Sequence, residues 1–175
     1  MKRFTIAVAG LLTVATIAVQ AAEAQQRVAR GARGNAAGGI TAGQIHDRTG
    51  PNGGTLRGGR GILTDGQGNG IAGSANCANG EAGRACRAGV TTRTAEGEVA
   101  HRSGIRVEGA NGKELESAGG FTKDADGNIN QARTTEASGE QGAVTVDKTY
   151  TSEAGRTRTV TCANTAGEIV ACPTR

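Results

Sequence analysis

The most regular feature of the sequence is a series of glycine-ending triplets between residues 95 and 142, each followed by an apolar residue. The four glycines are 15 residues apart, and the apolar residues follow them after two or three positions: Val99, Leu115, Ile129 and Val144. A three-residue β-hairpin loop needs a left-handed residue after a type I turn, which is the position that these glycines would occupy. The pattern therefore predicts antiparallel β-hairpins.

Further turn signals lie midway between the triplets, at Ser103–Gly104 and Gly119–Gly120. They predict strands of about four to six residues between turns. Two flanking stretches, Leu63–Gly70 and Tyr150–Val160, indicate more hairpins. Residues 62–175 are thus predicted to form an all-β, antiparallel hairpin-repeat domain, arranged as a meander, an open barrel or a solenoid. Chance regularity in a glycine-rich sequence is the alternative, and the apolar residue beside each triplet argues against it.

Strand alternation predicts which residues share a face around these turns. Pairing about Asn111 places Val107 opposite Leu115, with Ile105 and Ser117 on the same face. The opposite face would carry charged side chains: Arg106, Glu108, Glu114 and Glu116. Pairing about the next turn predicts two more cross-strand pairs: Phe121 with Gln131, and Lys123 with Ile129.

The four cysteines lie in two similar stretches, Cys77 to Cys86 and Cys162 to Cys172. Both stretches begin Cys-Ala-Asn and end Ala-Cys. Three connectivities are possible, and the similarity favours one disulfide within each stretch, as in small exported proteins. The two stapled hairpins would close the first and last parts of the repeat. A zinc site is the competing interpretation, but the C-x₂₋₄-C spacing typical of such sites is absent.

The first 24 residues have the order of features of a secretory signal. Met1–Arg3 is basic, Phe4–Val19 is apolar, and Ala22–Ala24 has the form of a cleavage site. The alternative is a membrane anchor, but the apolar run is shorter than the roughly 20 residues that a spanning helix needs. We therefore expect export to the periplasm, cell surface or medium, with no transmembrane segment after signal removal.

Residues 25–61 differ in composition from the rest of the chain. They contain eleven glycines, six arginines and one acid, whereas residues 62–175 contain 12 basic and 14 acidic residues. We expect residues 25–61 to be a flexible basic arm. Its arginines are candidates for polyanion binding: Arg27, Arg30, Arg33, Arg48, Arg57 and Arg60. A solvated linker is the alternative, and the arm has no aromatic residue on which a base could stack.

Candidate catalytic chemistry is sparse. The chain has two histidines, 30 glycines, one tyrosine and no tryptophan, so a deep apolar pocket is not expected. We expect a non-enzymatic, self-associating structural or adhesive protein of the cell envelope or extracellular matrix, without cofactor, metal or small-molecule substrate. The alternative function is binding of extracellular nucleic acid, acidic polysaccharide or anionic lipid through the arm. A hydrolase would need His101 as its base.

Overall fold

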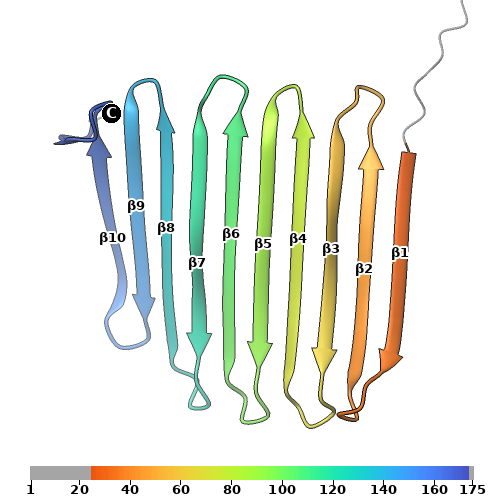
Figure 1. Ribbon diagram of the computed structural model, residues 1–175. Helices are drawn as coiled ribbons and strands as arrows, with labels where there is room; N and C mark the ends of the chain where they lie inside the picture. The colour runs from red at the N-terminus through yellow and green to blue at the C-terminus, as the bar shows by residue number, and fades with distance from the viewer. Residues whose placement is uncertain (1–24, 174–175) are drawn as a thin grey trace, which may run out of the picture.

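The computed structural model describes residues 25–173, which form one antiparallel β-sheet of eleven strands (Figure 1). The predicted signal, residues 1–24, lies outside the described residues. The strands are β1 (Gln25–Gly34), β2 (Ile40–Thr49), β3 (Thr55–Thr64), β4 (Gly70–Gly80), β5 (Gly83–Arg93), β6 (Val99–Gly109), β7 (Glu114–Lys123), β8 (Ile129–Gly139), β9 (Gly142–Thr151), β10 (Gly155–Ala163) and β11 (Ile169–Val170).

The sheet is an open meander, in which each strand pairs with the next one along the chain. Figure 1 shows the strands side by side in a single layer, with β1 at one edge and β10 near the other. This arrangement confirms the all-β, antiparallel prediction. It also selects the meander from the three arrangements that the sequence left open.

The hairpin turns have the geometry that the glycine triplets predict. At residues 95–97, the Thr94 N–H donates to the Glu98 carbonyl (3.0 Å), and the Gly97 N–H donates to the Thr94 carbonyl (3.1 Å). Gly97 has a φ of +94°, in the left-handed region. The same two bonds close the turns at Gly38, Gly53, Gly112, Gly127 and Gly167. The triplet at 140–142 differs, because Gly139 pairs with Gly142 across a two-residue loop.

The predicted registers around two of these turns are confirmed. Val107 is opposite Leu115 on β6 and β7. The next hairpin holds the other two predicted pairs, Phe121 with Gln131 and Lys123 with Ile129. The loop length fixes these registers, because a three-residue loop leaves one way for the two strands to pair.

The strands are about twice as long as we predicted. The ten long strands have 9 to 11 residues, and β6 and β7 pass through Ser103–Gly104 and Gly119–Gly120 without turning. A side chain at Gly120 would collide with the carbonyl oxygen of His101 on β6. The predicted turns at these two sites are wrong, because glycine also marks places where neighbouring backbones approach closely.

The predicted flexible arm, residues 25–61, is part of the sheet. This segment supplies β1, β2 and most of β3, so the predicted boundary after residue 61 falls inside β3. The positive-φ glycines Gly38, Gly53, Gly68 and Gly83 have the same 15-residue spacing, offset by one residue from the series that begins at Gly97. The arm prediction is wrong because we required apolar residues for a strand. A strand between two partners is held by backbone hydrogen bonds, which small side chains do not prevent.

Within residues 25–173 no layer covers either face of the sheet, so this part of the chain has no conventional core. Among the described residues, Ser117 and Cys162 are the only buried side chains, at 7% and 5% exposure. Large apolar side chains such as Ile45, Ile62 and Phe121 stay exposed on one face or the other. Stability must therefore come mainly from the backbone ladder, the turns and the disulfides.

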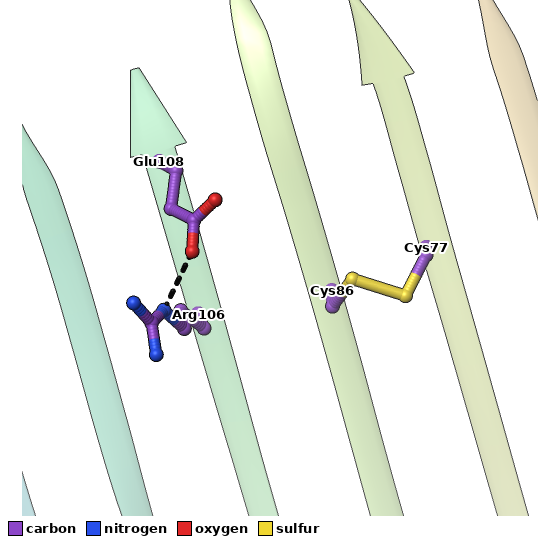
Figure 2. Close-up of a disulfide and its surroundings, with 4 residues drawn as sticks. All are labelled: Cys77, Cys86, Arg106 and Glu108. Carbon is purple, nitrogen blue, oxygen red and sulfur yellow. Dashed lines mark ion pairs between the residues drawn. A yellow bond between two sulfur atoms is a disulfide. The ribbon is translucent and has the colours of Figure 1, made fainter. Parts of the chain in front are cut away.

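Both predicted disulfides are present. Cys77 and Cys86 are directly opposite on β4 and β5, with Cα atoms 4.1 Å apart (Figure 2). Cys162 of β10 is bonded to Cys172, which follows β11, with Cα atoms 5.3 Å apart. All four cysteines are thus bonded to sulfur, which excludes the competing zinc site. Because three strands precede β4, the first disulfide lies inside the sheet, and the prediction that it closes the first part of the repeat is wrong.

A candidate polyanion-binding face

The two faces of the sheet differ in charge. Side chains alternate between the faces along a strand, and residues directly opposite on neighbouring strands share a face. We call the face that contains Val107 and Leu115 the basic face, and the other the mixed-charge face. The strands place ten basic residues and no acidic residue on the basic face: Arg30, Arg48, Arg60, Arg87, Arg93, Lys123, Arg133, Lys148, Arg156 and Arg158.

The mixed-charge face carries equal numbers of basic and acidic strand residues. Its six cations are Arg27, Arg33, Arg57, Arg84, Arg102 and Arg106. Its six acids are Asp47, Glu108, Glu114, Glu116, Glu136 and Asp147. The other acids of residues 25–173 lie in the turns. The basic face is therefore free of acids because every strand acid points the other way.

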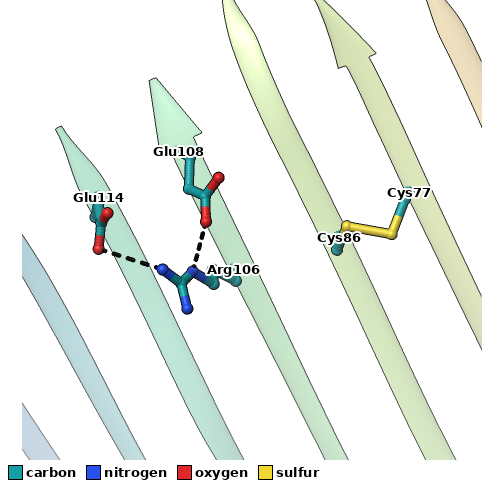
Figure 3. Close-up of polar contacts among 5 residues, drawn as sticks. All are labelled: Cys77, Cys86, Arg106, Glu108 and Glu114. Atoms are coloured by element: carbon teal, nitrogen blue, oxygen red, sulfur yellow. Dashed lines mark ion pairs between the residues drawn. A yellow bond between two sulfur atoms is a disulfide. The ribbon is translucent and has the colours of Figure 1, made fainter. Parts of the chain in front are cut away.

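The ion pairs found among residues 25–173 also lie on the mixed-charge face. Arg106 bridges Glu108, at 2.8 Å from Nε, and Glu114, at 3.7 Å from Nη2 (Figure 3). Arg106 is opposite Cys86, beside the Cys77–Cys86 disulfide (Figure 2). The third ion pair joins Arg57 to Asp47 at 3.1 Å. No ion pair among the described residues lies on the basic face, so the positive charge of this face is free to attract an anion from outside the molecule.

One row of the basic face crosses all ten long strands, and we call it the central row. It consists of Arg30, Gln44, Arg60, Ser74, Gly89, Ser103, Gly119, Arg133, Lys148 and Arg158. On β8, β9 and β10 it places Arg133, Lys148 and Arg158 directly opposite one another. Like charges in this position destabilise a sheet. A polyanion bound across the three strands would offset this repulsion, because each of the three cations would attract it.

Hydroxyl groups hold the Arg133 side chain across β7. Its Nη1 donates to Ser117 Oγ (3.1 Å) and its Nη2 to Ser103 Oγ on β6 (3.0 Å). Gly119 lies between Arg133 and Ser103 in the central row and has no side chain to block this path. Because hydroxyls are neutral, the guanidinium is held in place and keeps its full charge.

A hollow of about 480 Å³ lies on the basic face over β1 to β6. Its larger lining side chains come from Arg30, Gln44, Arg60, Ile62, Thr91 and His101. Its floor is low because Ser74 and Gly89 have little or no side chain. The hollow is therefore flanked by two cations and is wide enough for several atoms of a ligand.

Beside the central row runs a second one, which we call the aromatic row. It consists of Thr91, His101, Phe121, Gln131, Tyr150 and Arg156. His101 Nδ1 lies 2.8 Å from Thr91 Oγ1. The His101 and Phe121 rings stack with their centroids 5.7 Å apart and their planes at 28°. Two neighbouring strands thus hold a ready-made pair of stacked rings at the surface.

The six arginines predicted to bind polyanions do not form one site. Arg30, Arg48 and Arg60 lie on the basic face. The others, Arg27, Arg33 and Arg57, lie on the mixed-charge face. The sequence interpretation missed the seven other cations of the basic face, because residues 62–175 contain 12 basic and 14 acidic residues and therefore look nearly neutral in total. Assigning alternate residues of each strand to opposite faces, starting from the predicted turns, would have separated the cations of the basic face from the acids of the other face.

Residues 25–173 contain neither a metal-binding cluster nor a helix that could span a membrane. No three histidine, cysteine or acidic side chains come together there in a metal-binding arrangement. The same part of the chain has no helix with the length and apolarity to cross a bilayer.

Comparisons of the chain with protein-family models, with curated proteins and with solved structures find no match.

Proposed function

We propose that this chain is an exported, non-enzymatic structural or adhesive protein that attaches to a polyanion of the cell surface or extracellular matrix through its basic face. The observation that carries the proposal is the segregation of charge, with ten strand cations and no strand acid on one side. The two disulfides suggest an oxidising, extracellular setting, in which acidic polysaccharide and released nucleic acid are the abundant polyanions.

A flat array of cations suits a long, repetitive ligand. Each anion that meets an arginine or lysine releases condensed counterions, so affinity grows with the number of contacts and falls steeply with salt. Arg133, Lys148 and Arg158 offer three contacts on adjacent strands, about 4.8 Å apart. Arg30 and Arg60 continue the same row at the other end of the sheet.

The experiment compares two charge-matched triple variants of the purified, oxidised protein. Arg133→Gln/Lys148→Gln/Arg158→Gln empties the β8–β10 end of the central row, and Arg27→Gln/Arg33→Gln/Arg57→Gln removes three charges from the mixed-charge face. Binding to heparin is measured over a series of salt concentrations. We expect the first variant to lose at least about tenfold in affinity and to show a shallower salt slope, and the second to stay close to wild type. Equal losses of heparin affinity in both variants, or an affinity that does not depend on the salt concentration, would reject the proposal.

A second candidate function, self-association into a layered structure, is supported by the mixed-charge face. Its β1–β5 half carries four arginines and one aspartate, a net charge of +3. Its β6–β10 half carries two arginines and five acids, a net charge of −3. A second copy turned over about an axis parallel to the strands would place each half on its complement. Such a two-fold contact is self-complementary and closed.

This arrangement brings specific opposite charges together. With the axis between β5 and β6, Arg84 of one copy faces Glu108 of the other, because the two residues are in the same row of the sheet. Arg57 likewise faces Glu136. Each face covers about 1,600 Å², against about 800 Å² per partner in a standard interface. Two basic faces could not stack in this way, because each carries only positive charge.

A further inference from the structure

The aromatic row is an unusual feature of a basic surface. Phe121 and Tyr150 are the only phenylalanine and tyrosine among residues 25–173, and the strands place both in this one row. His101 extends the row by one strand and stacks on Phe121. Phe121 remains 36% exposed, so its ring is not used to fill a core. Aromatic rings at the surface of a thin sheet suit a ligand with flat faces.

The aromatic row runs alongside the cations of the central row. Tyr150 and Lys148 are two residues apart on β9, which separates the rows by about 6.7 Å. Tyr150 is opposite Arg156 on β10, and Arg156 and Arg158 lie on the same face of that strand. The two rings thus lie on β7 and β9, and the cations of the central row lie beside them on β8, β9 and β10. A polymer lying across the strands would meet both rows at once.

Three classes of polyanion make different use of such a surface. A polyphosphate needs only the cations, and a duplex keeps its bases stacked inside. A single-stranded nucleic acid presents phosphates on one side and unstacked bases on the other. Proteins bind it without sequence preference by combining a basic groove with aromatic stacking. Of these three classes, the single-stranded nucleic acid is the one that uses both rows.

We propose that the basic face binds single-stranded nucleic acid, with bases stacked on Phe121 and Tyr150 and phosphates held by Arg133, Lys148 and Arg158. The proposal rests on the polyanion-binding function above and adds the class of ligand. His101 supports the Phe121 ring from the neighbouring strand. The Arg133 side chain is already held in place by two serines, so little freedom is lost when a phosphate binds.

The test uses the purified, oxidised protein and four probes: a 15-residue oligothymidine, a duplex of the same length, inorganic polyphosphate, and vesicles of anionic lipid. We expect the single strand to bind more tightly than the duplex. Phe121→Leu/Tyr150→Leu should weaken binding of the oligothymidine by at least about fivefold per ring while leaving polyphosphate binding unchanged. The matched control, Phe121→Tyr/Tyr150→Phe, keeps both rings and should bind like wild type.

The chain offers a direct spectroscopic readout of stacking. It contains one tyrosine and no tryptophan, so its intrinsic fluorescence reports on Tyr150 alone. Oligothymidine should quench this emission, after correction for absorbance by the oligonucleotide, and polyphosphate should not. Circular dichroism of each variant checks that the sheet is retained.

The outcomes separate this proposal from the one on which it rests. If the leucine variant binds oligothymidine as wild type does, or loses polyphosphate equally, stacking is rejected while polyanion binding stands. Tighter binding of the duplex also rejects the nucleic-acid proposal. Binding to vesicles of anionic lipid without any binding to oligothymidine would reject it in favour of a membrane ligand. Failure of every probe would reject both proposals.

Discussion

Single glycines decide whether side chains and strands can approach one another in this sheet. At Gly119, a Cβ would meet the carbonyl oxygen of Ala132 and the side chain of Arg133. Arg133 reaches its serine partners only because that volume is empty. Gly31 on β1 is different, since a Cβ there would meet nothing within 4 Å. The same residue type thus has a structural role at one site and none at the other.

Gly119→Ala should therefore destabilise the protein, whereas Gly31→Ala should not. We expect the first to lower the free energy of unfolding by about 1–3 kcal/mol, because strand and side chain must shift to admit the methyl group. The second should change it by less than about 0.5 kcal/mol, since surface substitutions away from such contacts have small effects. Urea unfolding of both variants measures the difference. Equal effects of the two substitutions would show that the close approach of β8 to Gly119 does not require glycine.

Asp124 contributes a pH dependence at the same scale. The pKa of its carboxyl is lowered by hydrogen bonds from the Asn128 side chain (2.9 Å) and backbone N–H (2.8 Å). A carboxyl whose pKa is lower in the folded state stabilises the fold above its unfolded pKa of about 3.9 and loses that effect as the pH falls. Asp65 makes the equivalent contacts with Asn69, and its pKa is lowered for the same reason.

Replacing Asp124 should consequently reduce the loss of stability that the protein shows as the pH falls from 7 to 3. We expect Asp124→Asn to lower the Tm at pH 7 and to have a much smaller effect near pH 3. Thermal unfolding monitored by circular dichroism between these pH values provides the measurement. Asp126→Asn changes the same turn and the same net charge, so it serves as the control. Identical profiles for the two variants would contradict the assigned role of Asp124.

At the scale of elements, each strand depends on its two neighbours, and the ends of the sheet are exceptions. β11 has two residues and pairs only with β10. The Cys162–Cys172 disulfide fastens the chain just beyond it. The Cys77–Cys86 disulfide instead joins two strands that already have ladders on both sides. The two disulfides close loops of similar length. One holds a short strand at the end of the sheet, and the other joins two long strands inside it.

Removing each disulfide should therefore change hydrogen exchange in different ways. The Cys162→Ala/Cys172→Ala variant should lose protection in β11 and the end of β10 only. The Cys77→Ala/Cys86→Ala variant should keep its local protection pattern and lose about 2–3 kcal/mol of global stability, the value expected for a loop of about ten residues. Hydrogen exchange read by mass spectrometry distinguishes the two patterns. Local exchange around β4 and β5 in the second variant would refute this prediction.

The sequence predicted the positions and registers of the hairpin turns better than it predicted the lengths of the strands. Loop chemistry is local, so the register of Val107 with Leu115 followed from one glycine turn. Strand length is not local, because Gly119–Gly120 gives a turn signal whether the chain turns or a neighbour approaches. The strands of residues 25–61 were missed because a ladder of backbone hydrogen bonds leaves no apolar pattern. The basic face needed all registers at once and could not be seen in any single segment.

At the scale of the whole molecule, the arrangement of charge favours contact between faces over contact between edges. The edge strand β1 carries Arg27, Arg30 and Arg33, and β10 carries Arg156 and Arg158, with no acid on either strand. Charged edge strands discourage pairing with other sheets. The mixed-charge face, with its two complementary halves, is the surface that a second copy can cover.

Charge reversal on the mixed-charge face should prevent dimer formation, and mixing two variants should restore it. Glu108→Lys/Glu136→Lys gives both halves of the face a net positive charge. Arg57→Glu/Arg84→Glu gives both halves a net negative charge. We expect each variant alone to raise the dimer Kd at least about tenfold, or about 1.4 kcal/mol. An equimolar mixture should form heterodimers, because every facing pair is again opposite in sign. Light scattering after size-exclusion chromatography measures the masses, and monomers in the mixture would reject the two-fold stacking.

The 15-residue spacing of the turn glycines has a consequence for how such a molecule can change in size. Residues 98–127 span two complete steps, so their deletion would join Gly97 to Asn128 and rebuild a turn of the same type. Arg93 would then lie opposite Ile129 in place of Val99, and no remaining side chain would change sides. Gain or loss of a 30-residue unit would widen or narrow the molecule by about 10 Å. Duplication of one gene segment could therefore set the reach of the protein without redesigning its surface.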